Sequence, residues 1–156
     1  MNHQSEIYKI TFNQLNNNYK LILKNTHSND YCELEVKSSD AKNIALAREG
    51  VISQRLKTYN FIISIFNLLN IKIDKIIILK KNNFITSNII LIIEGSKISI
   101  ESNFIDAIIL SLKTFSVLLI NDNLYKSESN LIYEDFKYKN IKDNLLNAVD
   151  GKNKIK

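Results

Sequence analysis

The side chains in this sequence that could perform chemistry are mostly carboxylates. Asp40 and Asp106 each lie at the start of a segment with helical spacing, and Glu49 lies at the end of the first of these segments. Glu101 follows a strand-like run. Metal-dependent hydrolysis of a phosphodiester requires carboxylates that converge on one or two divalent ions. These residues are therefore candidates for such a site, and the alternative is that they act as helix caps and surface charges.

Other common active-site patterns are absent from the sequence. The three glycines are too far apart to form a phosphate-binding loop. One cysteine, Cys32, and two histidines, His3 and His27, cannot complete a tetrahedral zinc shell. Neither histidine lies in the ordered surroundings that a Cys/His hydrolase requires. We expect Cys32 to be a small apolar side chain in a half-buried strand and both histidines to be exposed polar residues.

Length and composition indicate one domain with a short appendage, because 156 residues can form a single core without disulfides. A lone cysteine indicates a reducing compartment. The first residues lack a secretory signal, and the apolar runs are far shorter than the roughly 20 residues of a membrane span. We therefore expect a cytoplasmic protein that does not enter a membrane.

The net charge of +5 has two explanations. It could attract an acidic partner such as nucleic acid, provided that the positive side chains are clustered. Lys, Asn and Ile are frequent, Arg occurs twice and Pro is absent, which is also the pattern produced by A/T-rich codons. The charge alone does not choose between these explanations.

The chain alternates between strand and helix patterns. Strands are expected at residues 6–12, 19–24, 31–36, 71–80, 84–93, 98–101 and 116–120. Helices are expected at residues 39–49, 59–69 and 104–114, with Ser38 or Ser39, Thr58 and Asn103 as their N-caps. Turns are expected at residues 82–83 and 94–97, and Gly50 is expected just past the first helix. A lysine-rich amphipathic helix is expected at residues 131–149.

These elements predict an α+β fold. We expect a mixed, mostly antiparallel sheet of about six to eight short strands, two or three packed helices, and a C-terminal helix. The strands between residues 71 and 101 are apolar on both faces in places, so they are expected to lie centrally with helices against them. A domain at residues 1–127 would be followed by a helical extension at 128–156. The two helices that open with an acidic residue and alanine suggest a distant internal repeat.

Several short sequence segments occur in the same order as in the bifunctional nuclease family, and the chain resembles this family over roughly residues 7–127. Asp40-Ala41 opens a helix that follows three strands and ends at Glu49-Gly50. Residues 54–60, Gln-Arg-Leu-Lys-Thr-Tyr-Asn, stand where the family has Pro-Arg-Pro-Leu-Thr-His-Asp. A strand then leads to residues 101–112, where Asp106-Ala107 opens a second helix. The retained positions are Asp40, Ala41, Gly50, Arg55, Thr58, Asp106 and Ala107.

This resemblance implies hydrolysis of DNA and RNA without strong sequence preference. Asp40, Glu49 and Asp106 would be the catalytic carboxylates, and they would hold a divalent cation, Mg²⁺ or Mn²⁺, with Asp40 and Asp106 as its main ligands. Arg55 and Lys57 would contact the nucleic-acid phosphates. The ion would polarise the phosphoryl oxygen and lower the pKa of an attacking water.

The sequence also departs from the family pattern. Tyr59 and Asn60 replace a His-Asp pair, and residues 103–105 replace Arg-Pro-Ser. These changes remove a phosphate-binding fork and an acid/base group. The alternative function is therefore a non-catalytic, dimeric module that binds nucleic acid or a partner protein. The aromatic and lysine side chains suited to such contacts are Tyr133, Phe136, Lys137, Tyr138 and Lys139.

Overall fold

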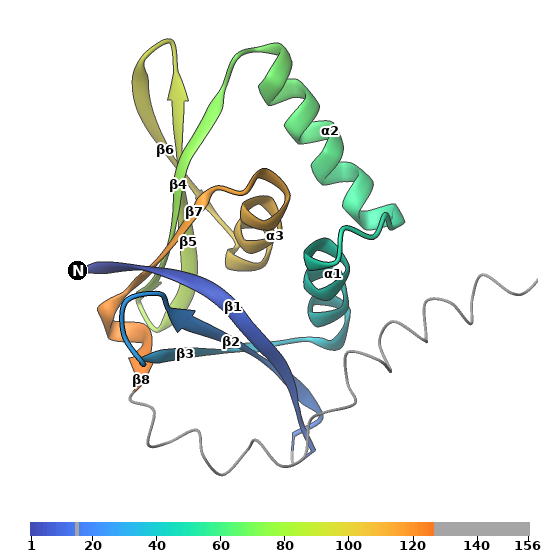
Figure 1. The fold of residues 1–156 in the computed structure, drawn as a ribbon, viewed down its shortest axis with the longest axis vertical. Helices are drawn as coiled ribbons and strands as arrows, with labels where there is room; N and C mark the ends of the chain where they lie inside the picture. The colour runs from blue at the N-terminus through green and yellow to red at the C-terminus, as the bar shows by residue number, and fades with distance from the viewer. Residues whose placement is uncertain (15, 127–156) are drawn as a thin grey trace, which may run out of the picture.

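The computed structural model describes residues 1–14 and 16–126. Within this part, three α-helices and eight strands occur (Figure 1). The strands are β1 (Asn2–Asn13), β2 (Asn18–Asn25), β3 (Tyr31–Val36), β4 (Lys72–Lys81), β5 (Phe84–Ile93), β6 (Ser96–Ser102), β7 (Val117–Asn121) and β8 (Tyr125–Lys126). The helices are α1 (Ser38–Arg48), α2 (Gln54–Leu68) and α3 (Phe104–Thr114), and a short 3₁₀ helix spans Asp122–Leu124.

All eight strands belong to one mixed sheet with the order β6-β5-β4-β7-β1-β2-β3-β8. Only β4 and β7 pair in parallel, and the other neighbours are antiparallel. The predicted α+β class and the mostly antiparallel sheet are thus confirmed. The predicted helix at 131–149, the extension at 128–156 and the domain boundary at 127 lie outside the described residues.

The sheet is built from two similar halves. In each half, three consecutive strands form an antiparallel meander, and a helix follows the third strand: β1-β2-β3-α1 and β4-β5-β6-α3. Both helices have 11 residues, with aspartate at the third position and alanine at the fourth. The structure thus supports the internal repeat suggested by the sequence, and it makes Asp40 and Asp106 equivalent residues of the two halves.

The core lies between the sheet and two of the helices. α3 packs on β4, β5 and β7, and α1 packs on β2 and on α3. Figure 1 shows α1 and α3 within the curve of the sheet and α2 beyond them. α3 is covered by the sheet and by α1, and it is apolar around most of its surface. Ile108 and Ile109 are both fully buried. By contrast, α2 buries only Leu56 and Tyr59.

Several element boundaries agree with the sequence prediction because their turn chemistry is strong. Two-residue loops join β4 to β5 and β5 to β6, and all four loop residues have positive φ, as a type I′ hairpin requires: Asn82, Asn83, Glu94 and Gly95. Gly50 (φ +68°) ends α1 and Asn70 (φ +54°) ends α2. Asn103 caps α3, since its side chain accepts a hydrogen bond from the Ile105 amide at 2.8 Å.

Three sequence predictions about the elements were wrong. α2 begins at Gln54, several residues before the predicted start, because Ser53 rather than Thr58 accepts the capping hydrogen bond, from the Leu56 amide. The N-cap of α1 is Lys37, which makes no side-chain capping bond. β6 is an edge strand rather than a central one, because no further strand pairs with its outer side in the described residues.

Among the described residues, no helix combines the length and the apolar character needed to cross a bilayer.

Packing of α3 in the core predicts a large cost for removing its central side chain. Ile108→Ala is expected to lower the free energy of unfolding by about 3–4 kcal/mol, because the buried site leaves a cavity. Ile98→Ala on β6 is the matched control, since this side chain is 45% exposed and its loss should cost about 1 kcal/mol. Urea denaturation of both variants measures the difference, and equal losses would contradict the core described above.

Candidate functional site

The starts of the two acidic helices are connected through α2. The Arg55 guanidinium lies 3.7 Å from a carboxylate oxygen of Asp40, measured from Nη2 to Oδ1. The Tyr59 hydroxyl donates a 2.5 Å hydrogen bond to Oδ1 of Asp106. Arg55 and Tyr59 are four residues apart and therefore lie on one face of α2. We call Asp40, Arg55, Tyr59 and Asp106 the helix-start cluster.

Local sequence explains why α2 presents this pair to the other helices. Ser53 starts the helix, and Leu56 and Tyr59, three residues apart, insert into the core with 0% and 6% exposure. Their burial fixes the rotation of α2 about its axis. As a result, Arg55 is placed beside α1 while its side chain remains 54% exposed.

The two aspartates are held by their own helices. Asp40 and Asp106 both lie in the first turn, where the helix dipole favours a negative charge. The alanine that follows each aspartate, Ala41 or Ala107, is fully buried, which allows α1 and α3 to pack closely. Asp40 keeps 21% of its side chain exposed, so solvent or a ligand can reach its carboxylate.

The chemical state of Tyr59 follows from its surroundings. Burial raises the pKa of Tyr59 to about 12, and the hydrogen bond to Asp106 acts in the same direction, while the nearby Arg55 guanidinium opposes them. Tyr59 is therefore a neutral hydrogen-bond donor near pH 7. Unlike histidine, it cannot exchange a proton with a substrate by titrating in this range.

Not every predicted site residue reaches the helix-start cluster. Glu49 is the C-cap of α1, nine residues after Asp40, which corresponds to about 13 Å along the helix axis. Lys57 is exposed and lies two residues after Arg55, so the two side chains leave α2 in different directions. Glu101 lies on β6, where it pairs with Lys81 at 3.0 Å. The structure thus pairs Arg55 with Asp40 and Tyr59 with Asp106. Glu49 lies at the other end of α1, and Glu101 pairs on β6.

The oxygen ligands available for a metal are limited. In residues 1–14 and 16–126, no group of three or more His, Cys, Asp or Glu side chains could hold a metal ion. Mg²⁺ commonly takes one or two carboxylates and completes its shell with water and substrate phosphate. Two aspartates are too few for a metal site that is formed by protein ligands alone.

The structure shows the surroundings of the cysteine and of the two histidines. Cys32 is fully buried in β3, and burial raises the pKa of its thiol to about 12, so the reactive thiolate does not form near neutral pH. His3 contacts Asp122 and the Tyr125 ring. His27 is exposed in the β2–β3 loop. His3 differs from expectation in being only partly exposed, because Asp122 and Tyr125 cover it.

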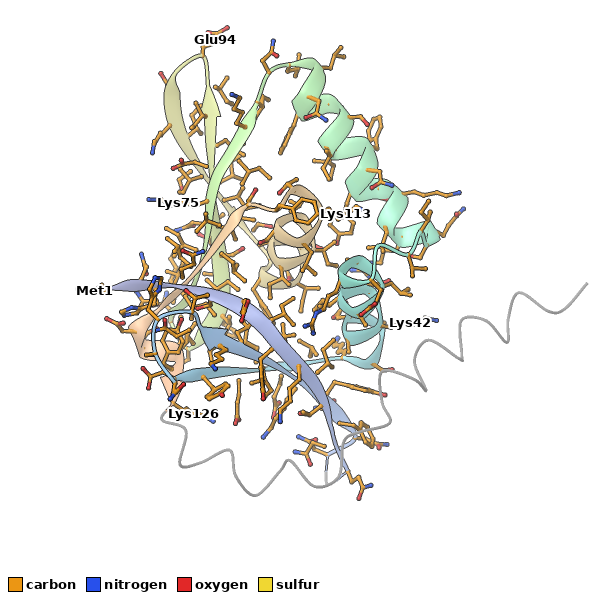
Figure 2. All side chains as sticks on the ribbon, viewed as in Figure 1. Met1, Lys42, Lys75, Glu94, Lys113 and Lys126 are labelled. Carbon is orange, nitrogen blue, oxygen red and sulfur yellow. The ribbon has the colours of Figure 1, made fainter. Side chains whose placement is uncertain are left out.

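Four lysines labelled in Figure 2 lie on different elements of the fold, namely α1, β4, α3 and β8. Figure 2 shows Lys42, Lys75, Lys113 and Lys126 on separate sides of the fold. These four lysines belong to four different elements, so they do not by themselves form one basic surface. Arg55 is a cation that the structure places beside Asp40 and near the Tyr59 hydroxyl.

Sequence reasoning treated Tyr59 only as the loss of a family histidine. A signal for its role was present, because Ser53 is a good N-cap and would have placed Arg55 and Tyr59 on one helical face. The predicted start at Thr58 hid this spacing.

Comparison with known proteins agrees with this fold. A search of curated proteins finds no match to the chain. The family model of the bifunctional nuclease domain matches residues 21–132, well over half of the 156 residues. The match includes both acidic helices and all of α2. The chain therefore belongs to the bifunctional nuclease domain family.

Proposed function

We propose that this protein is a nuclease that hydrolyses phosphodiester bonds in DNA and RNA without strong sequence preference. The observation that supports this proposal best is the helix-start cluster, in which α2 brings an arginine and a tyrosine to both acidic helices. Carboxylates that hold a metal ion and an arginine that binds the phosphate are the side chains that this reaction requires. The family match supports a nuclease in general terms.

Each member of the cluster has a distinct role in the proposal. Asp40 and Asp106 would hold Mg²⁺ or Mn²⁺ together with a phosphate of the substrate. The bound ion would polarise the phosphoryl oxygen and lower the pKa of an attacking water. Tyr59 fixes the orientation of the Asp106 carboxylate through its hydrogen bond.

Arg55 would bind the phosphate by leaving Asp40. At 3.7 Å and with a half-exposed guanidinium, the Asp40–Arg55 ion pair contributes little stability, so exchanging it costs little. A phosphate offers the guanidinium two acceptor oxygens in a forked arrangement. Lys57 remains a predicted contact to a neighbouring phosphate, and Glu49 lies outside the proposed centre.

A second function is favoured by two features of the same cluster. Both carboxylates already have a protein partner, and Tyr59 cannot act as an acid or base near neutral pH. The cluster could then serve to join three helices in a domain that binds nucleic acid without cutting it. The experiments below separate the two functions.

Cleavage assays on variants of the two aspartates test the proposal. We expect wild-type protein to cut single-stranded RNA and single- and double-stranded DNA with Mg²⁺ or Mn²⁺, and a chelator to stop the reaction. Asp40→Asn and Asp106→Asn should each lower kcat/KM by roughly 100-fold or more. Asp74→Asn is the matched control, because this aspartate lies on β4 and pairs with Lys97.

Circular dichroism must show that the variants remain folded. Glu49→Gln should retain activity, since Glu49 lies about 13 Å from Asp40 along the axis of α1. If folded wild-type protein cuts none of the substrates with either ion, the binding function replaces the proposed one, and gel shifts over a salt series then measure binding.

The role of Arg55 can be separated from that of a general positive charge. Arg55→Gln should raise KM for a short oligonucleotide roughly tenfold, because a forked phosphate contact is lost. Lys57→Gln removes the same charge two residues further along α2, and it should raise KM much less. Steady-state kinetics of the two variants decide the question, and equal effects would mean that only net charge matters.

The buried hydroxyl of Tyr59 predicts a specific alkaline instability. The pKa of Tyr59 is raised from 10.0 to about 12 in the folded protein, so the folded state keeps a proton that the unfolded state loses. The corresponding stability is present below pH 10 and is lost as the pH rises from 10 to 12. Tyr59→Phe should cost about 1 kcal/mol below pH 10 and should weaken this alkaline decline.

Urea midpoints of both proteins below pH 10 and near pH 11 provide the comparison. Cys32 and Tyr125 also titrate at alkaline pH, but they are common to both proteins, so the difference reports on Tyr59. Parallel alkaline declines in the two proteins would show that the buried Tyr59 hydroxyl does not control this loss of stability.

A further inference from the structure

The outward face of α2 is apolar. Phe61, Ile65, Leu68 and the following residue Leu69 are 65%, 37%, 81% and 60% exposed. Their spacing places them on one face of the helix, within about 100° of arc at 100° per residue. Leu56 and Tyr59, the buried residues of α2, lie on the opposite face. We call the four exposed residues the outer stripe.

The surroundings of the outer stripe are also unusual for a water-exposed helix. No charged residue occurs from Thr58 to Ile71, although 24% of the chain is charged. A surface helix normally carries charged or polar side chains on the face away from the core. α2 is apolar both on the face toward the core and on the face away from it, which indicates that a second surface covers the outer face.

We propose that the outer stripe is the contact surface of a homodimer, in which α2 packs against α2 of a second copy. A two-fold contact requires a patch that is complementary to itself. An uncharged stripe meets this requirement, because two copies with a net charge of +5 can approach there without placing like charges face to face. A charged partner such as nucleic acid would find no complementary group on the stripe.

The size of the stripe suits a dimer of modest affinity. With roughly 150–200 Å² for each whole side chain, the exposed fractions correspond to on the order of 400 Å² of apolar surface. Stable interfaces bury about 800 Å² per partner, including a polar rim. The stripe therefore supplies the apolar centre of such an interface, and the polar residues flanking it on α2 would supply part of the rim.

A second copy would also complete the packing of α2. Besides its two buried residues, α2 borders a surface hollow on another side, lined in part by Asn60, Ile63 and Ser64. The helix that positions Arg55 and Tyr59 is thus held on one face only within a single copy. This inference does not depend on the proposed catalytic chemistry, since the outer stripe includes neither Arg55 nor Tyr59.

Oligomeric state in solution tests the inference with the full chain. Sedimentation velocity should show a wild-type dimer at high protein concentration that dissociates on dilution. Phe61→Lys should be a folded monomer over the same range, because the dimer would bury two unpaired charges. Phe84→Lys is the matched control: Phe84 is 78% exposed at the β4–β5 turn, and this variant should dimerise as wild type does.

A crosslinking experiment identifies the surface directly. Cys32 is buried, so a thiol introduced by Leu68→Cys is the accessible one among the described residues. A short bis-maleimide should join two copies through this thiol and should not do so in Phe84→Cys.

Two results would overturn the inference. The first is a wild-type protein that stays monomeric at every concentration. The thiol of Leu68→Cys would then be either reactive as an exposed group or shielded by another part of the same chain, such as residues 127–156. The second is a dimer that survives Phe61→Lys unchanged. In either case the nuclease assays remain interpretable, because they do not require the dimer.

Discussion

The close packing of α1 against α3 is the constraint on which the rest of the structure depends. Each helix follows a three-stranded meander, and each presents a fully buried alanine at its fourth position, Ala41 or Ala107. A larger side chain at either position would displace its neighbours, because protein interiors have no spare volume. Because the preceding residue is an aspartate in both cases, packing of the two halves also fixes where the two carboxylates stand.

The third helix connects this arrangement to solvent. α2 is anchored by Leu56 and Tyr59, and the same rotation that buries these two residues directs Arg55 toward Asp40 and the outer stripe away from the core. One helix therefore has three different faces: an anchor, a contribution to the candidate site, and an apolar surface. Few buried contacts also make α2 the helix whose position is easiest to change.

Much of this fold could be predicted from the sequence, for identifiable reasons. The hairpin loops at Asn82–Asn83 and at Gly95 use residues that tolerate positive φ, and Asn103 is a strong helix cap, so both turns and the start of α3 were predicted correctly. The turn at Gly95 is shorter than predicted, because β6 already begins at Ser96. The start of α2 was wrong because two capping residues, Ser53 and Thr58, compete and only tertiary burial of Leu56 selects the first. That error concealed the pairing of Tyr59 with Asp106. The parallel pairing of β4 with β7 could not be predicted, because it depends on contacts between residues far apart in the sequence.

Tyrosine at position 59 limits what chemistry the site can perform. A histidine there could exchange protons near neutral pH, but a tyrosine with a pKa of about 12 keeps its proton and can only donate a hydrogen bond. If the proposed hydrolysis occurs, the proton of the attacking water must leave to solvent, to a phosphate oxygen or to an aspartate. Asp40 is the better candidate of the two aspartates, because its ion pair with Arg55 is long, while the carboxylate of Asp106 already accepts a hydrogen bond from Tyr59. The two equivalent aspartates of the repeat would then have different roles, and the difference would come from the single side chain that α2 presents to each.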